Sequence, residues 1–479
     1  MIKKRLFING EWRKSDDQAM IPVSNPANGE IIGEVVAATL DDVNSAALAA
    51  HEAFKSWRNT SPFHRGALLR KSADEVRMRA EAISYCLSLE QGKPLKEALE
   101  EVDKAANILE YYAEEGERVY GKILPNSDGE RCSQVFYEPI GPCAALSPWN
   151  YPLELLTWKL GAALAAGCTI VCKLPSDTPL SPLMYLEAVL TAGYPNGVIN
   201  ILTGSGEALG EALVKHPLIR KIAFTGSTEV GRRIASYASE GPKPVTLELG
   251  GNSPMLVFAD ADLDAAVTGA TRRAFRNLGQ VCIAVNRLYV QRPVYDCFLE
   301  QFVAETKKLR IGHGAVDDCE LGALCKQEVL DRALEHIEDA VAKGAQVLTG
   351  GKRPEGEKFK GGMFFEPTIV ANASHDMLLM QEETFGPVVG VMPFDRIEEA
   401  ICLANQTVYG LAAIVYSSSL ATVSKVARAL DYGSVAINNP DPGIISAPYG
   451  GRKSSGFGYE HAHEGLMEYL VIKHVRLKV

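Results

Sequence analysis

Short apolar runs rich in β-branched residues alternate with amphipathic stretches over residues 143–345 of this chain. Residues 41–57 and 68–89 place apolar side chains at helical spacing, which predicts two amphipathic helices. Runs bounded by turn residues predict short buried strands at 169–173, 197–202, 221–225 and 254–258. Because strands alternate with helices, we expect an α/β fold built on parallel sheets.

Residues 130–140 and 469–479 show a different pattern. The first segment alternates apolar and polar side chains like an exposed antiparallel strand, and the second is a β-rich run at the C-terminus. Isolated strands are not stable on their own, so we expect both segments to pair with other strands.

Length and charge narrow the functional classes. A chain of 479 residues exceeds what one hydrophobic core usually serves, so we expect about two or three lobes. The formal charge of −10 argues against a nucleic acid or an anionic membrane as partner, since either needs a basic face. No stretch of about 18 apolar residues occurs and the start does not resemble a signal peptide, so we expect a cytoplasmic protein without a membrane span.

The ten cysteines are scattered and never form Cys-x-x-Cys, which argues against a metal site and a disulfide framework. Cys168 and Cys172 lie in an apolar run and indicate packing. Cys282 differs, because it follows the amide- and glycine-bearing residues 276–280. A thiolate is a strong nucleophile even at a small ionised fraction. The alternative for Cys282 is a buried apolar cysteine.

Glu248 and Asn150 are further candidates. Glu248 lies thirty-four residues before Cys282 and just before two glycines that let the backbone turn tightly near a ligand. Asn150 lies in the turn 148–152, between an apolar strand and the helical pattern of 153–166. Its amide can donate to a developing oxyanion. Alternatively, it bonds only to nearby backbone in the turn.

Glycine-bearing turns follow predicted strands at residues 204–210 and 224–231. The first misses the pattern G-x-G-x-x-G by one residue. We favour the second turn, because its hydroxyls and free N–H groups lie at the start of a helix, where a dinucleotide pyrophosphate is stabilised.

In their order and spacing, these motifs resemble the aldehyde dehydrogenase superfamily from Asn25 to the C-terminus. The resemblance implies an aldehyde dehydrogenase-like α/β fold with a variant Rossmann cofactor domain, an α/β catalytic domain and a small β oligomerisation element. The expected boundaries are 1–122 and 142–249 for the NAD(P)-binding domain, 250–445 for the catalytic domain, and 123–141 and 460–479 for the oligomerisation strands. It also implies a homodimer or homotetramer, and residues 448–456 are interpreted as a structural connection to the last strand.

The resemblance implies oxidation of an aldehyde to its acid with NAD or NADP. Cys282 attacks the aldehyde carbon, Glu248 activates the water that hydrolyses the thioester, and Asn150 stabilises the oxyanion, with Lys159 as a further catalytic residue. The implied cofactor-binding residues are Trp149, Lys173, Ser176, Gly226, Ser227, Leu249, Glu383 and Phe385.

Position 176 bears on the cofactor. NAD-restricted members of the family often have glutamate there, which repels a 2′-phosphate, whereas Ser176 permits NADP. The alternative is that Lys173 is a surface lysine beside a turn serine.

Within the superfamily, the chain is most similar to the succinate-semialdehyde dehydrogenases, notably at residues 90–95 and 275–277. Arg276 would bind the carboxylate of an acidic semialdehyde, because a guanidinium can bind both oxygens. The alternative is an arginine that turns away to a neighbouring carboxylate. The implied substrate-binding residues are Arg276, Tyr151, Trp158 and Gly443.

The chain also departs from that subgroup. Trp158 stands where those enzymes have a second arginine, and Gly443 replaces the serine of their anion site, with Ser446 nearby as a replacement. Ala284 removes the second cysteine of a redox switch. A dehydrogenase of neutral aliphatic or aromatic aldehydes is therefore the alternative.

Glu248 argues against a CoA-acylating enzyme, and the presence of Cys282, Glu248 and Asn150 argues against an idle structural protein.

Overall fold

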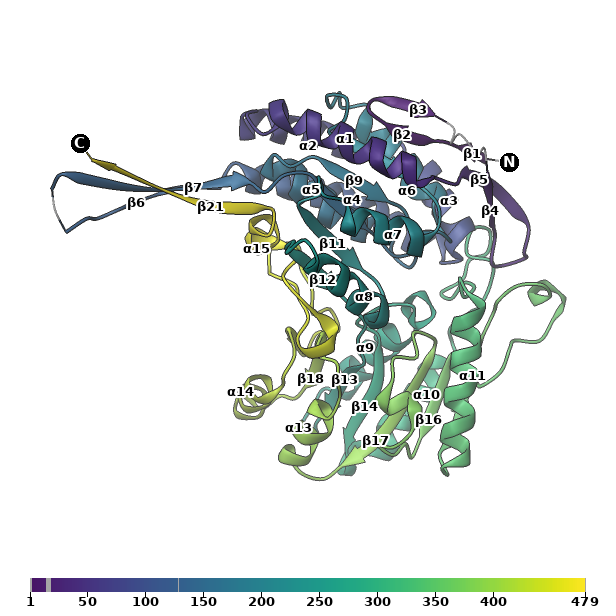
Figure 1. The fold of residues 1–479 in the computed structure, drawn as a ribbon. Coiled ribbons are helices and arrows are strands. Elements are labelled where there is room, and N and C mark those ends of the chain that lie inside the picture. Colours follow the sequence, from purple (N-terminus) through teal and green to yellow (C-terminus); the bar gives the residue numbers. More distant parts are fainter. Residues whose placement is uncertain (1, 14–18, 128, 479) are drawn as a thin grey trace.

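The computed structural model describes residues 2–13, 19–127 and 129–478, and two large sheets organise this part of the chain (Figure 1). The eight-stranded sheet is parallel at its centre and has antiparallel strands at its edges. Its strands, in order, are β20 (Gly456–Phe457), β12 (Val245–Glu248), β11 (Lys221–Thr225), β8 (Cys143–Leu146), β9 (Ile170–Lys173), β10 (Ile199–Leu202), β2 (Leu6–Ile8) and β3 (Glu11–Arg13).

Helices cover both faces of this sheet, and alternate strand residues contact the two layers. Cys143 and Ala145 of β8 belong to one core, and Ala144 and Leu146 to the other, as the two-residue period of a strand requires. One layer holds α1 (Leu40–Trp57), α7 (Gly206–Lys215) and α8 (Thr228–Ser239). The other holds α2 (Pro62–Met78), α3 (Ala80–Gln91), α4 (Leu95–Gly116), α5 (Glu154–Ala166) and α6 (Leu180–Leu190).

The seven-stranded sheet forms the second lobe, below the first in Figure 1, and is parallel except at β15. Its order is β15 (Gln346–Thr349), β16 (Thr368–Ala371), β17 (Val388–Phe394), β14 (Val285–Gln291), β13 (Ser253–Val257), β18 (Ala412–Tyr416) and β19 (Ser434–Ile437). The helices of this part are α9 (Leu263–Phe275), α10 (Tyr295–Thr306), α11 (Gln327–Ala342), α12 (Leu378–Gln381), α13 (Ile397–Asn405) and α14 (Leu420–Ala429).

A narrow antiparallel sheet extends away from both lobes (Figure 1). It consists of β6 (Lys122–Leu124), β7 (Arg131–Pro139) and β21 (Leu470–Lys478), and β21 follows the short helix α15 (Ala462–Met467). The segments 130–140 and 469–479 therefore pair with each other, in register from Leu470 opposite Pro139 to Lys478 opposite Arg131. A second three-stranded sheet contains β1 (Ile2–Lys4), β5 (Ile31–Val36) and β4 (Met20–Ser24).

The expected α/β class is confirmed, and the predicted buried strands agree with β9, β10, β11 and β13 to within a few residues. The prediction of a single helix over 68–89 is wrong. The chain leaves the helix at Arg79 (φ −109°, ψ 12°), between α2 and α3. Buried apolar positions continue on both sides of this break, as at Val76 and Ile83, so periodicity could not reveal it. The domain boundaries stay predictions. Among the described helices, none is long and apolar enough to cross a bilayer.

Candidate active site

A strained turn carries Cys282 to the region between the two large sheets. Asn277, Leu278 and Gly279 all have left-handed φ values, of 48°, 52° and 72°. The side chain of Gln280 braces the turn, because its Nε2 donates to Asn277 O (2.9 Å) and its Oε1 accepts from the N–H of Cys325 (2.8 Å). Such conformations persist only where the surroundings hold them in place, and they gather at functional sites.

Cys282 borders two cavities, of about 420 Å³ and 350 Å³. Burial raises the pKa of its thiol to about 12. Tyr449 contacts the thiol, with Oη 3.9 Å from Sγ. The segment 448–456 is thus more than a structural connection, since it places a tyrosine beside the nucleophile.

Glu248 ends strand β12 and is buried, and neither of its carboxyl oxygens has a hydrogen-bond partner among the described residues. Burial, and next the charge of Glu460, raise its pKa well above the ordinary value, while Lys159 opposes this shift. Lys159 is also buried, and its Nζ donates to Glu460 Oε1 (2.7 Å) and Thr225 Oγ1 (2.6 Å). Sequence reasoning missed Glu460.

Asn150 is buried and borders the same two cavities as Cys282. Its Nδ2 donates to the carbonyl of Gln280, in the turn that carries the nucleophile, at 3.0 Å. When a carbon atom is attached to Cys282, an oxygen on that carbon can develop negative charge. The side-chain amide of Asn150 can donate a hydrogen bond to this oxygen.

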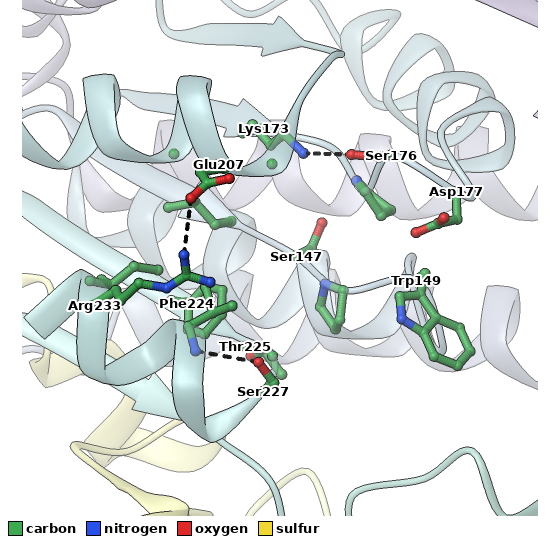
Figure 2. A pocket seen from close by; sticks show the side chains of 18 of the residues that line it. Ser147, Trp149, Lys173, Ser176, Asp177, Glu207, Phe224, Thr225, Ser227 and Arg233 are labelled. Carbon is green, nitrogen blue, oxygen red and sulfur yellow. Dashed lines mark hydrogen bonds and ion pairs between the residues drawn. The ribbon is translucent and has the colours of Figure 1, made fainter. Parts of the chain in front are cut away.

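A further cavity of about 400 Å³ lies at the carboxyl ends of β8, β9 and β11 (Figure 2). Lys173 and Ser176 line it, with Lys173 Nζ donating to Ser176 Oγ at 3.3 Å. Burial lowers the pKa of Lys173 to about 8. Gly206 and Gly210 also line this cavity, so the turn at residues 204–210, which we did not favour from the sequence, contributes to it as well.

Gly226 and Ser227 line the same cavity at the N-terminus of α8. A Cβ at Gly226 would lie 2.4 Å from the Phe224 ring, so this close turn needs glycine. The positive end of the helix dipole faces the cavity, as an anion requires. Trp149 and residues 225–227 also line the 350 Å³ cavity, so the two cavities adjoin and together suit an elongated dinucleotide.

Leu249, Glu383 and Phe385 line the 350 Å³ cavity beside Cys282. Glu383 Oε1 accepts from the N–H of Gly251 (2.9 Å), and burial raises its pKa to about 7. The Phe385 ring meets Trp149 edge-on, with centroids 5.4 Å apart. These residues fit the nicotinamide half of NAD or NADP, because a carboxylate can accept from ribose hydroxyls and the rings can flank a flat heterocycle.

The 420 Å³ cavity on the other side of Cys282 has a charged wall, in which arginines lie among the carboxylates of Glu100, Glu101, Glu154 and Asp441. Arg272, Arg273 and Arg276 line it, and Tyr151 and Gly443 are also part of its lining. Arg276 Nη2 lies 2.9 Å from Glu100 Oε2. In the sequence analysis, the alternative to a substrate-binding role was that Arg276 pairs with a neighbouring carboxylate. The structure has this ion pair, although Arg276 also lines the cavity. Arg272 and Arg273 pair with Asp441.

Trp158 is buried and is not among the described residues that line this cavity. His461 does line it and stacks on Trp158 with centroids 3.5 Å apart, so it lies between the indole and the substrate space. Tyr449 stacks on His461 in turn, at 4.9 Å. Ser446 is exposed and is also absent from the described lining. Sequence reasoning missed His461, and the only signal available was its place next to Glu460 in a glycine-rich segment.

Comparison with known proteins gives matches over the whole chain. Residues 12–475 match the aldehyde dehydrogenase family. The chain is 43% identical over 478 residues to the NADP+ succinate-semialdehyde dehydrogenase of Escherichia coli K12, covering 99% of this chain and 98% of that protein. It is 42% identical over 482 residues to glutarate-semialdehyde dehydrogenase of Pseudomonas putida, covering 100% and 98%. The structure of Staphylococcus aureus betaine aldehyde dehydrogenase in complex with NAD+ matches with a TM-score of 0.97 and 37% identity, covering 100% and 95%.

Proposed function

The chain belongs to the aldehyde dehydrogenase family, and we propose that this NAD(P)-dependent enzyme oxidises an acidic semialdehyde, such as succinate semialdehyde, to the dicarboxylic acid. The observation that carries this proposal is the wall formed by Arg272, Arg273 and Arg276, which line the same cavity as Cys282. A carboxylate at the far end of an aldehyde can exchange with the protein carboxylates that these guanidinium groups now bind. Relatives named for succinate and glutarate semialdehyde support the proposal.

Each of these residues has a separate role in the proposed reaction. Cys282 Sγ attacks the aldehyde carbon, and the amide of Asn150 stabilises the negative oxygen that results. When bound, NAD or NADP would accept the hydride that this carbon loses, and this loss leaves the carbon as a thioester on Cys282. Glu248 then takes a proton from the water that attacks the thioester, and the charges of Glu460 and Lys159 act on its carboxyl group in opposite directions. The acid leaves and the thiol is restored.

An aldehyde panel tests the substrate class. It contains succinate and glutarate semialdehydes, a sulfonated aldehyde, an aliphatic aldehyde and an aromatic aldehyde, each measured with NAD and with NADP. We expect kcat/KM for the anionic aldehydes to exceed that for neutral aldehydes of equal length by at least about tenfold, the effect of one charge-assisted hydrogen bond. An equal or higher kcat/KM for the neutral aldehydes would overturn the proposal.

A dehydrogenase of neutral aldehydes is the second candidate. It is favoured by the pairing of the cavity's arginines with Glu100 and Asp441, and by the aromatic stack of Tyr449, His461 and Trp158. Flat or apolar substrates would pack on Tyr449 and His461 without displacing any ion pair. The same panel separates the two candidates.

We also propose that the enzyme assembles into a homodimer or homotetramer through the sheet of β6, β7 and β21. This sheet leaves Ile123, Phe136 and Ile472 exposed, by 77%, 44% and 69%. Apolar side chains on a projecting sheet are typical of a surface that is covered in an assembly. Sedimentation measurements should show a mass of at least twice the 51.8 kDa of one chain, and a monomer at micromolar concentration would contradict the proposal.

A further inference from the structure

A fully buried ion pair lies beneath the loop that carries Asn150. Lys93 follows the end of α3, Glu101 lies on α4, and Nζ is 2.6 Å from Oε2 with both side chains 0% exposed. Burying two charges costs free energy unless their remaining hydrogen-bonding capacity is satisfied. The other hydrogen bonds of Lys93 and Glu101 therefore identify the backbone segment that the pair stabilises.

Lys93 has a partner for each direction in which its ammonium group can donate. Besides Glu101, Nζ donates to the backbone carbonyl of Asn150 at 2.8 Å and lies 3.8 Å from the centroid of the Tyr151 ring. Glu101 Oε1 accepts from the N–H groups of Leu153 (2.9 Å) and Glu154 (3.3 Å), at the start of α5. The pair thus binds both ends of the segment 150–154.

The backbone around Lys93 is itself fixed by residues 314–323, which lie between α10 and α11. The carbonyl of Gly92 accepts from the N–H of Ala323 (3.1 Å), and the N–H of Leu95 donates to Gly314 O (2.8 Å). The packing is so close that a Cβ at Gly322 would lie 1.8 Å from Gly92 O. The backbone of Lys93 is therefore held in place, which limits the positions that its ammonium group can reach.

Asn150 needs this support, because its side chain is held on one side only. The side-chain amide of Asn150 donates to Gln280 O. The backbone carbonyl of Asn150 accepts from Lys93 and, at 3.3 Å, from Asn277 Nδ2. An amide that stabilises an oxyanion must be held close to its productive position before the charge develops.

We propose that Lys93, paired with Glu101, is a positioning residue that fixes the oxyanion amide of Asn150. The proposal rests on the role of Asn150 in the proposed function. Within the part of the chain that the structure describes, Lys93 lines neither of the cavities that border Cys282, so it acts through the residues that it contacts there, Asn150 and Tyr151, which both line the 420 Å³ cavity. A role through Asn150 requires the effect of Lys93 to disappear when the Asn150 amide is removed.

A double-mutant cycle tests the coupling. Lys93→Met, Asn150→Ala and the double variant are compared with the wild type, using the panel aldehyde of highest kcat/KM. Lys93→Met should lower kcat by about 10- to 100-fold, a part of the loss expected when an oxyanion donor is removed. In the Asn150→Ala background, the same change should cost less than about threefold, because residues that act as one unit are not additive. Independent, additive losses would overturn the proposal.

Controls separate positioning from general damage. Lys96 is an exposed lysine on α4, the helix that carries Glu101, and Lys96→Met should leave kcat unchanged. Cofactor affinity and the rate at which iodoacetamide alkylates Cys282 should be the same in Lys93→Met and wild type, since neither needs an oxyanion site. If Lys93→Met does not fold, Lys93→Gln replaces it in the cycle with the same expectation, because Glu101 lines the 420 Å³ cavity and its replacement would also change the substrate space. If Asn150→Ala alone keeps kcat within threefold, the mechanism under the proposed function fails, and the positioning role with it.

Discussion

Tyr449 Oη lies 3.9 Å from Cys282 Sγ, although 167 positions separate the two residues in the sequence. The hydroxyl is the side-chain group that counteracts burial at this thiol, because a hydrogen bond to sulfur favours the thiolate and lowers its pKa. The C-terminal segment therefore adjusts the reactivity of the nucleophile.

Tyr449→Phe should slow alkylation of Cys282 by iodoacetamide at pH 8.5, by about two- to fivefold, the effect of losing one weak hydrogen bond. Because burial raises the pKa of Cys282 to about 12, the rate should rise about tenfold per pH unit up to pH 10 without a plateau. Mass spectrometry of the Cys282 peptide measures the rate. The exposed Cys297 serves as internal control, and an equal change at both cysteines would count against the hydrogen bond.

Glu248→Gln should permit the first hydride transfer and stall hydrolysis of the thioester, because an amide cannot take a proton from water. Neither carboxyl oxygen has a hydrogen-bond partner within the described part of the chain, so the replacement breaks no such bond there and should leave the fold intact. Stopped-flow absorbance should show a burst of reduced cofactor close to one per subunit, followed by a slow phase. Cys282→Ala should show neither phase. Undiminished steady-state turnover in Glu248→Gln would show that another group acts as the base.

Ser176→Glu should lower kcat/KM for NADP about tenfold or more relative to NAD, through repulsion between the new carboxylate and the 2′-phosphate. The contact between Lys173 and Ser176 places this residue at the cavity wall. Ser176→Gln is the matched control, since it adds the same bulk without charge. Equal losses with both cofactors in Ser176→Glu would place the adenosine ribose elsewhere.

Arg276→Met should lower kcat/KM for an anionic aldehyde by roughly 10- to 150-fold, which corresponds to about 1.5–3 kcal/mol, and should change it little for a neutral one. Glu100→Gln provides the opposite test. It removes the nearer of the two carboxylates that pair with Arg276 and leaves Glu97, whose Oε2 lies 3.7 Å from Arg276 Nε, so KM for the anionic aldehyde should fall. Parallel losses for both substrate classes in Arg276→Met would make the arginine a structural residue and favour the neutral-aldehyde candidate.

The stability of the enzyme should decrease as the pH falls below about 6.5. Burial lowers the pKa of His461 to about 3, so the folded state keeps this imidazole neutral while the unfolded chain takes up a proton. At pH 5.5 this residue alone should cost about 1.4 kcal/mol relative to neutral pH. His461→Asn removes the titration, and the strained backbone at this position, with φ 62° and ψ 170°, is as unfavourable for histidine as for asparagine. The shift in urea midpoint between pH 7.5 and 5.5 should be smaller in this variant than in the wild type.

The sequence by itself determined the fold class, the positions of the buried strands and the segments that border the cavities. These properties depend on patterns within a few neighbouring residues. Apolar runs bounded by turns predicted strands such as β9 and β11, and glycines predicted turns where the backbone comes close to other groups, as at Gly226. Of the residues predicted around Cys282, Asn150 and Glu383 line its cavities, whereas Glu248 and Lys159 are not among the described residues that line either one.

Only the tertiary structure decided which partner each polar side chain has. Arg276 pairs with Glu100, 176 positions away, and Lys159 pairs with Glu460, 301 positions away. Trp158 lies behind His461 instead of on the cavity wall, and Lys93 reaches the carbonyl of Asn150. The direction of a side chain and the charge that it meets depend on how distant segments pack. A local pattern can identify a residue that is able to do chemistry, but the packing of the whole chain decides what that residue contacts.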